Sequence, residues 1–169
     1  MSDAATGGFQ VADNPLSPVF PKSLGDGSGY SVSAGADALT ITPVAASSAT
    51  ATRPASALDG GTGSNAISYA NVWPGEDVQY QVSSGEVKES VVLDQVPPAV
   101  QTSWSWLVHA PGLKLVTQAS GAIYAEEPDG SAQIAIPTPV VTDSSGVAGQ
   151  AVRVGNCGRL NDGRPAALG

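Results

Sequence analysis

The chain has 169 residues, enough for one domain with an ordinary hydrophobic core and no cross-links. Seven Lys and Arg against fifteen Asp and Glu give a net charge of −8, which repels nucleic acids and anionic membranes and excludes both as partners. Only 13% of the residues are charged, too few for long amphipathic helices. The small and β-branched residues that dominate favour short strands and tight turns, so an all-β fold is expected.

Signals for cross-linking and targeting are absent from the sequence. The single Cys157 excludes a disulfide within the chain, and no apolar run is long enough to predict a transmembrane helix. The first ten residues lack the basic and apolar regions of a Sec-type signal peptide. We therefore expect a protein that leaves the cell without Sec export, or a segment whose signal has been removed.

Three segments are expected along the chain. Residues 1–29 are rich in proline and glycine, which predicts an extended N-terminal arm that is ordered only where it lies on another surface. Residues 30–154 are predicted to form one β-sandwich domain, and residues 155–169, which show no alternation, a short C-terminal tail.

The first strands of the sandwich are short. Residues 30–33 and 38–43 alternate on either side of a turn at Gly35. Residues 45–56 predict at most an edge strand, because Pro54 cannot donate a hydrogen bond to a neighbouring strand.

The stretch 67–93 carries the strongest β signal. Pro74-Gly75 predicts a turn, after which apolar residues alternate with polar ones over 78–82, as in a half-buried strand. A second turn at 83–85 and the β-branched run 86–93 place another strand beside it.

Further short strands follow at nearly regular spacing, with turn residues between them. They are predicted over 103–109, 113–118, 122–126, 131–136, 140–142 and 150–154. The pattern predicts an antiparallel β-sandwich of about eight to eleven strands. Its predicted core consists of Val78, Tyr80, Val82, Val91, Leu93, Trp104, Trp106, Leu113, Leu115, Ile134 and Ile136.

Turn residues and alternating apolar residues also follow a recognisable serial order over about half of the chain. This order consists of Tyr69, Val72, Pro74-Gly75, Asp77-Val78, Tyr80, Val87-Lys88-Glu89, Val91, Leu93, Trp104, Gly112-Leu113, Asp129-Gly130, Pro137, Pro139, Asp143 and Gly146. It resembles a β-rich module near the N-terminus of large secreted actinobacterial RHS/YD-repeat proteins and related surface proteins. The resemblance implies a non-catalytic sandwich in an exported cell-surface or toxin-delivery protein, and brings no catalytic residues. A short version of such a module suits an extracellular protein or an actinobacterial phage virion, as a capsid decoration or tail component.

Candidate catalytic groups are few. His109, the only histidine, could be combined with Ser103 or Ser105 in a hydrolase triad, but no nucleophile-elbow motif accompanies it. Glu126 and Glu127 are adjacent on a predicted strand and should point to opposite faces, so they do not form a pair for glycoside hydrolysis. We expect no enzyme.

Metal sites and cofactors are not expected either. The loops at 26–29, 59–65 and 143–146 offer oxygen atoms that would suit calcium alone among common metals. None has the ligand spacing of an EF-hand or a calcium-binding repeat, so ordinary turns are the better interpretation.

The aromatic residues suggest an alternative function. Trp73, Trp104 and Trp106, with the tyrosines, could form a platform for sugar rings, as in a carbohydrate-binding β-sandwich module. Trp104 and Trp106 share one strand face and are expected in the core, which leaves Trp73 as the exposed candidate.

The favoured function is a non-enzymatic structural or assembly module that acts through protein–protein contacts. The arm carries apolar side chains that an isolated subunit would leave in water, and an unpaired strand at 150–154 could accept another chain. We therefore expect a homo-oligomer or a larger assembly. The expected interaction residues are Phe9, Val11, Val19, Phe20 and Trp73.

Overall fold

The computed structural model describes residues 2–3, 8–11, 13–25, 27–52, 65–93 and 103–142. The chain divides into two compact units, Met1–Pro111 and Gly112–Gly169, which we call unit 1 and unit 2. The described residues form antiparallel strands and no α-helix, which confirms the predicted fold class. None of them belongs to a helix long and apolar enough to cross a membrane.

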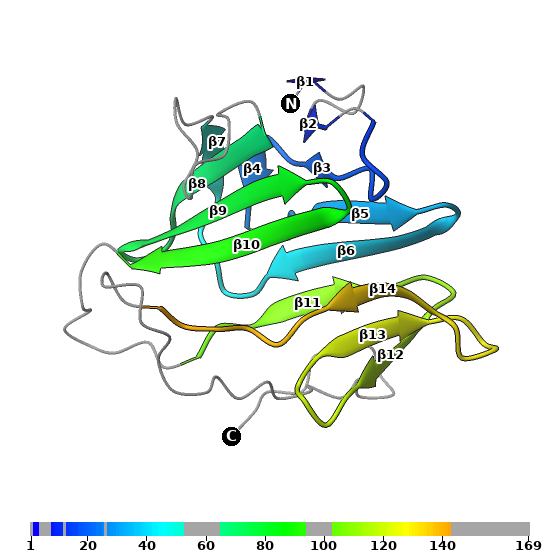
Figure 1. The fold of residues 1–169 in the computed structure, drawn as a ribbon. Coiled ribbons are helices and arrows are strands. Elements are labelled where there is room, and N and C mark those ends of the chain that lie inside the picture. Colours follow the sequence, from blue (N-terminus) through cyan, green and yellow to red (C-terminus); the bar gives the residue numbers. More distant parts are fainter. Residues whose placement is uncertain are drawn as a thin grey trace. The chain divides into compact units, whose positions relative to one another are not determined.

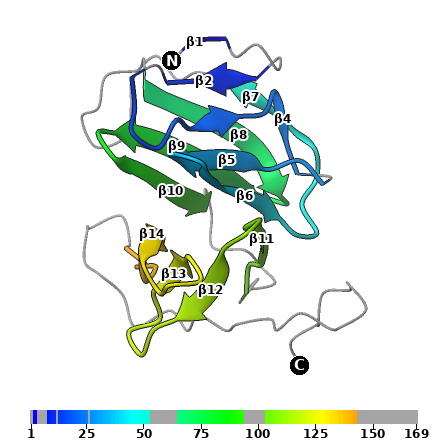
Figure 2. The same ribbon diagram turned by 90° about the vertical axis from the view of Figure 1, so that its right-hand side faces the viewer.

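Unit 1 is a sandwich of two antiparallel sheets (Figures 1 and 2). The first sheet has the order β1-β2-β3-β5-β6-β11 and the second has the order β10-β9-β8-β7-β4. The first sheet contains β1 (Ser2–Asp3), β2 (Phe9–Gln10), β3 (Val19–Phe20), β5 (Tyr30–Ala34), β6 (Asp37–Pro43) and β11 (Trp106–His109). The second contains β4 (Ser23–Leu24), β7 (Ala49–Thr52), β8 (Ala66–Trp73), β9 (Glu76–Ser83) and β10 (Glu86–Leu93).

Aromatic rings hold the two sheets of unit 1 together. The ring of Tyr80 on β9 lies 4.6 Å from that of Tyr30 on β5 and 5.1 Å from that of Phe20 on β3, measured between centroids. Tyr69 on β8 meets Tyr80 edge-on at 6.0 Å. Because aromatic side chains bury more apolar area than other residues, these four rings dominate the stabilisation of the sandwich.

The predicted central hairpin is confirmed as β8, β9 and β10. Gly75 and Gly85 take φ values of 78° at its two turns, a conformation that strongly favours glycine. The pairing aligns Val78 with Val91 and Tyr80 with Glu89, so the inward residues of β10 are the odd-numbered ones.

Most of the predicted core residues are buried or half-buried, but one is exposed. Val78, Tyr80, Val82 and Ile134 are buried. Leu93, in contrast, is 44% exposed, and its prediction as a core residue is wrong. It is the last residue of β10, which is the edge strand of its sheet, so little chain is left to cover it. The half-buried members are Val91, Trp104, Trp106, Leu113, Leu115 and Ile136.

The segment predicted as an arm is built into the sandwich. β2 pairs with β3 and β3 with β5 in the first sheet, and β4 then crosses to pair with β7 in the second. Phe20 and Leu24 are fully buried. The segment therefore supplies core residues to its own unit, and β7, predicted as an edge, is an inner strand because β4 covers it.

Unit 2 contains a three-stranded antiparallel sheet. Its strands are β12 (Lys114–Thr117), β13 (Ile123–Glu126) and β14 (Ala132–Ile136), in the order β12-β13-β14. Ala125 and Ile134 are its buried residues, and Gly130 turns the chain between β13 and β14 with a φ of 88°. The predicted strand at 150–154 and the tail at 155–169 lie outside the described residues.

Candidate functional site

Two of the expected interaction residues belong to the interior. Phe20 and Trp73 are only 0% and 3% exposed, whereas Phe9, Val11 and Val19 are half-buried. Trp73 is buried because it lies on the same side of β8 as the buried Tyr69 and pairs with the buried Glu76. The pairing of β8 is irregular between Tyr69 and Trp73, where Asn71 has a φ of 59°. The irregularity breaks the alternation, so Val72 and Trp73 are buried one after the other.

The indole groups of unit 1 have structural roles. Trp73 donates a hydrogen bond from Nε1 to the Val44 carbonyl oxygen at 3.2 Å and packs edge-on against Trp106. Trp104 donates from Nε1 to the carboxylate of Glu76, which is itself buried. The exposed indole that suggested sugar binding is therefore an interior residue.

His109 does not lie beside a serine nucleophile on its strand. It is an exposed residue at the end of β11, where it pairs with Thr40 of β6. Ser105 precedes it by four residues, which in an extended strand places the two about 13 Å apart. A nucleophile and its base must lie within about 3 Å of each other, so the imagined triad does not form with Ser105.

Asp129 lies in the turn between β13 and β14 of unit 2. Asp129 accepts hydrogen bonds from the backbone N–H and the hydroxyl of Ser131 at 2.8 and 2.7 Å. These bonds stabilise the carboxylate and lower the pKa of Asp129. Within the described part of the chain, no group of three or more His, Cys, Asp or Glu could hold a metal, and the proposed calcium loops at 59–65 and 143–146 lie largely outside it.

Besides Glu76, a second carboxyl group faces the interior of unit 1. Glu89 is an inward residue of β10 and lies opposite Tyr80. Burial raises the pKa of Glu89 to about 7, while the nearby Tyr80 hydroxyl and Trp106 indole act against this increase. Both of these donors are buried, and neither meets hydrogen-bond geometry with a described partner. The sequence contained this signal, since Glu89 has the same parity as Val87 and Val91.

The outer surface of the first sheet has an unusual composition. A row of aligned residues crosses five strands, formed by Gln10, Val19, Ser31, Thr40 and His109. Beside this row, Thr42 pairs with Leu107 and Ser33 pairs with Ala38. No Asp or Glu occurs among these nine residues, which we call the acid-free face.

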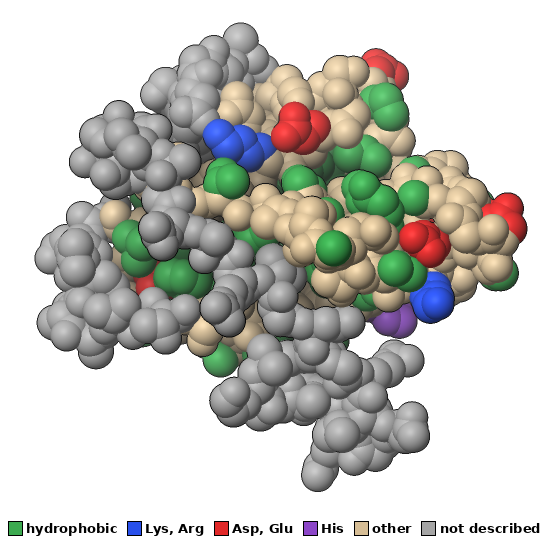
Figure 3. All heavy atoms as spheres, turned by 60° about the horizontal axis from the view of Figure 1, so that its bottom comes forward, with side chains coloured by type: hydrophobic (Ala, Val, Ile, Leu, Met, Phe, Trp, Pro, Cys, Tyr) green, Lys and Arg blue, Asp and Glu red, His purple; other side chains and the backbone are tan. Residues whose placement is uncertain are grey.

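The contrast with the rest of the molecule makes this face distinctive. The outer side of the second sheet presents Asp77, Glu86 and Lys88 on β9 and β10. Figure 3 shows one side of the molecule, on which the histidine is visible and the few acidic and basic side chains stand apart from one another. In a chain of net charge −8, the aligned residues of this face thus span five strands without a carboxylate.

The longest edge strand is a poorer site for another protein. β10 has eight residues and ends the second sheet, but Glu89 points inward from it and Lys88 outward. Inward-facing charges and edge lysines are devices that oppose the addition of another strand. The side chains of β10 therefore oppose the addition of another strand at this edge.

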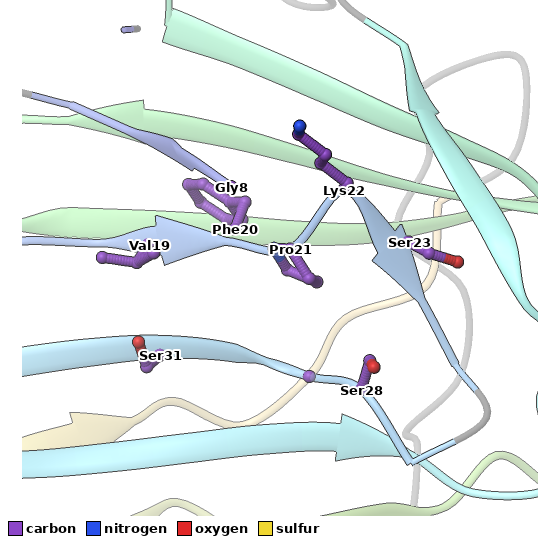
Figure 4. A pocket seen from close by; sticks show the side chains of 9 residues that line it. Gly8, Val19, Phe20, Pro21, Lys22, Ser23, Ser28 and Ser31 are labelled. Carbon is purple, nitrogen blue, oxygen red and sulfur yellow. The ribbon is translucent and has the colours of Figure 1, made fainter. Parts of the chain in front are cut away.

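A hollow opens beside the acid-free face, between β3 and the start of β5 (Figure 4). It lies where the chain leaves β3 at Pro21 to enter the other sheet. A Cβ atom on Gly29 would lie 2.2 Å from the Ile41 carbonyl oxygen, so glycine is required there. The hollow has a volume of about 400 Å³ and is lined by Gly8, Val19, Phe20, Pro21, Lys22, Ser23, Ser28, Gly29 and Ser31.

The acid-free face and the adjoining hollow were compared with known proteins through the whole chain. The chain matches no protein-family model, no curated protein and no solved structure.

Proposed function

We propose that this protein is a non-enzymatic structural or assembly module that acts through protein–protein contacts at the acid-free face. The composition of that face supports the proposal, since the centres of protein interfaces are depleted in charged residues. Burying an unpaired carboxylate is costly, whereas the hydroxyl groups of Ser31, Thr40 and Thr42 can hydrogen-bond across a contact while their carbon atoms are buried.

The setting of the module follows from its resemblance to surface proteins and is part of the proposal. An extracellular surface protein or a phage virion, as a decoration or tail component, would present this face to neighbouring proteins. The carbohydrate-binding alternative needed Trp73 to be exposed, but its indole is buried. The other described residues give this alternative no support.

Site-specific photo-cross-linking tests the proposal. A photoreactive amino acid at Thr40 would lie at the centre of the acid-free face, and one at Gln79 would lie on the outer side of the second sheet as the matched control. In the cells and culture medium where the protein occurs, we expect protein adducts from position 40 and few from position 79. Equal yields at the two positions would contradict a dedicated face.

A sugar titration distinguishes the proposed assembly module from the carbohydrate-binding alternative. All three tryptophans lie in unit 1, so saturable quenching of their fluorescence by a polysaccharide would favour a carbohydrate-binding module. We expect no saturable change.

A further inference from the structure

The acid-free face carries a projection and a hollow at opposite ends. Leu107 follows the inward-facing Trp106 on β11, so its side chain points outward, and it is 58% exposed. The hollow lies at the other end, beyond β5, with Pro21 on one wall and Ser31 on the other (Figure 4). The Lys22 side chain points away from Ser28 and Ser31, which leaves the wall on that side polar but uncharged.

The strand order makes this arrangement self-complementary. β3, β5, β6 and β11 are consecutive neighbours, so a line between β5 and β6 has β3 and the hollow on one side and β11 on the other. A two-fold axis along that line, parallel to the strands, would set two copies face to face. It would place β11 of each copy opposite β3 of the other, and neighbouring strands about 4.8 Å apart put these elements at equal distances from the axis.

The rows of the sheet also agree with this geometry. Rotation about an axis parallel to the strands preserves position along them, so each residue meets the same row of the other copy. Leu107 lies in the row of Thr42, and the antiparallel pairing of β5 with β6 places Gly29 in that row as well. Gly29 is one of the residues that line the hollow, so in this arrangement Leu107 of one copy faces the hollow of the other.

We propose that a second copy of this chain docks on the acid-free face as a two-fold dimer, in which Leu107 of each protomer enters the hollow of its partner. The inference rests on the proposed function and names its partner. Each copy carries −8, and pairing through this face limits the repulsion between two copies because none of the aligned residues that it brings into the contact has a carboxylate.

The size of the face predicts weak association. Four strands of about five residues cover about 19 Å by about 17 Å. That footprint is smaller than the roughly 800 Å² that each partner buries in a standard interface. Dimerisation should therefore be measured at millimolar protein concentration. Copies held close together in an assembly would experience a similar local concentration.

Two charge substitutions and their mixture test the pairing. Leu107→Arg removes both leucine contacts and should weaken dimerisation by more than about tenfold in sedimentation equilibrium, because each dimer buries two such side chains. Ser31→Glu places a carboxylate in the wall of each hollow and should also abolish the dimer. Mixing the two variants sets the introduced arginine beside the introduced glutamate at one contact and leaves the native contact at the other, so a heterodimer should recover.

Controls keep the outcomes distinct. Both substitutions lie on an outer surface, so circular dichroism should show folded variants, and Gln79→Arg with Gln79→Glu should leave dimerisation unchanged. Failure of the mixture to associate would overturn the two-fold pairing. A wild-type protein that stays monomeric yet forms adducts from position 40 with other proteins would overturn the self-pairing while supporting the proposed function. A monomer without adducts would overturn both.

Discussion

Glu89→Gln tests whether the inward carboxyl of β10 controls the stability of unit 1. Glutamine keeps the shape of the protonated acid and cannot ionise, so the substitution removes only the cost of a buried charge. Glu89 lies opposite Tyr80, and burial raises its pKa from 4.5 to about 7.

The sign of the effect follows from this increase. Below pH 4.5 the carboxyl is protonated in both folded and unfolded states, so the native protein bears no cost for it. As pH rises from 4.5 to about 7, the unfolded chain ionises first, and stability is lost until the folded group ionises as well. At about 1.36 kcal/mol for each pH unit the loss is about 3 kcal/mol, and water at the half-buried edge strand reduces it to about 2 kcal/mol.

Denaturant titrations followed by tryptophan fluorescence provide the assay, because all three tryptophans report on unit 1. We expect Glu89→Gln to match the wild type at pH 4 and to be about 2 kcal/mol more stable at pH 8. Glu86→Gln, at an exposed position of the same strand, controls for the loss of one negative charge. A difference between wild type and Glu89→Gln that is the same at both pH values would refute the reasoning.

Three further changes test the packing of unit 1. Trp106→Ala removes an indole packed against Trp73 and should lower the free energy of unfolding by about 3–5 kcal/mol in urea titrations, and a cost within error of zero would place this ring outside the core. Gly29→Ala would push a Cβ atom against the Ile41 carbonyl oxygen, so its melting temperature should fall while that of Ser28→Ala does not; equal values would contradict the close approach. Deleting residues 1–24 removes Phe20 and Leu24 from the core, so near-ultraviolet circular dichroism should be lost, and a truncated protein with an intact spectrum would show that the segment is dispensable.

The strands that the sequence predicted well are long and regular. Burial alternates along β9 from its first residue, apolar and polar residues alternate over its last six, and the turns on either side contain glycines that adopt the φ values they favour. Such signals are local, and from them the all-β fold class, the central hairpin and most of the hairpin's inward residues could be predicted.

The features that the sequence did not reveal depend on contacts between distant residues. β2, β3 and β4 have two residues each, which is too short for any periodicity, so the first segment was interpreted as an arm. Trp73 precedes a Pro-Gly turn and was expected to be exposed, but its pairing with the buried Glu76 places it in the interior. The acid-free face joins Val19, Ser31, Thr40 and His109 through pairings that only the sheet order defines.

The crossing of the first segment from one sheet to the other also affects how the protein folds during its synthesis. Phe20 packs on Tyr80, and the carbonyl oxygen of Pro21 accepts a hydrogen bond from the Tyr69 hydroxyl. These partners lie about 50 to 60 residues later in the chain, and ribosomes add about 5–20 residues per second. The first strands must therefore wait several seconds, with Phe20 and Leu24 unburied, before the second sheet exists to receive them. A chaperone that binds nascent apolar segments would find its target in this segment, and pausing of translation before residue 80 would lengthen the exposure.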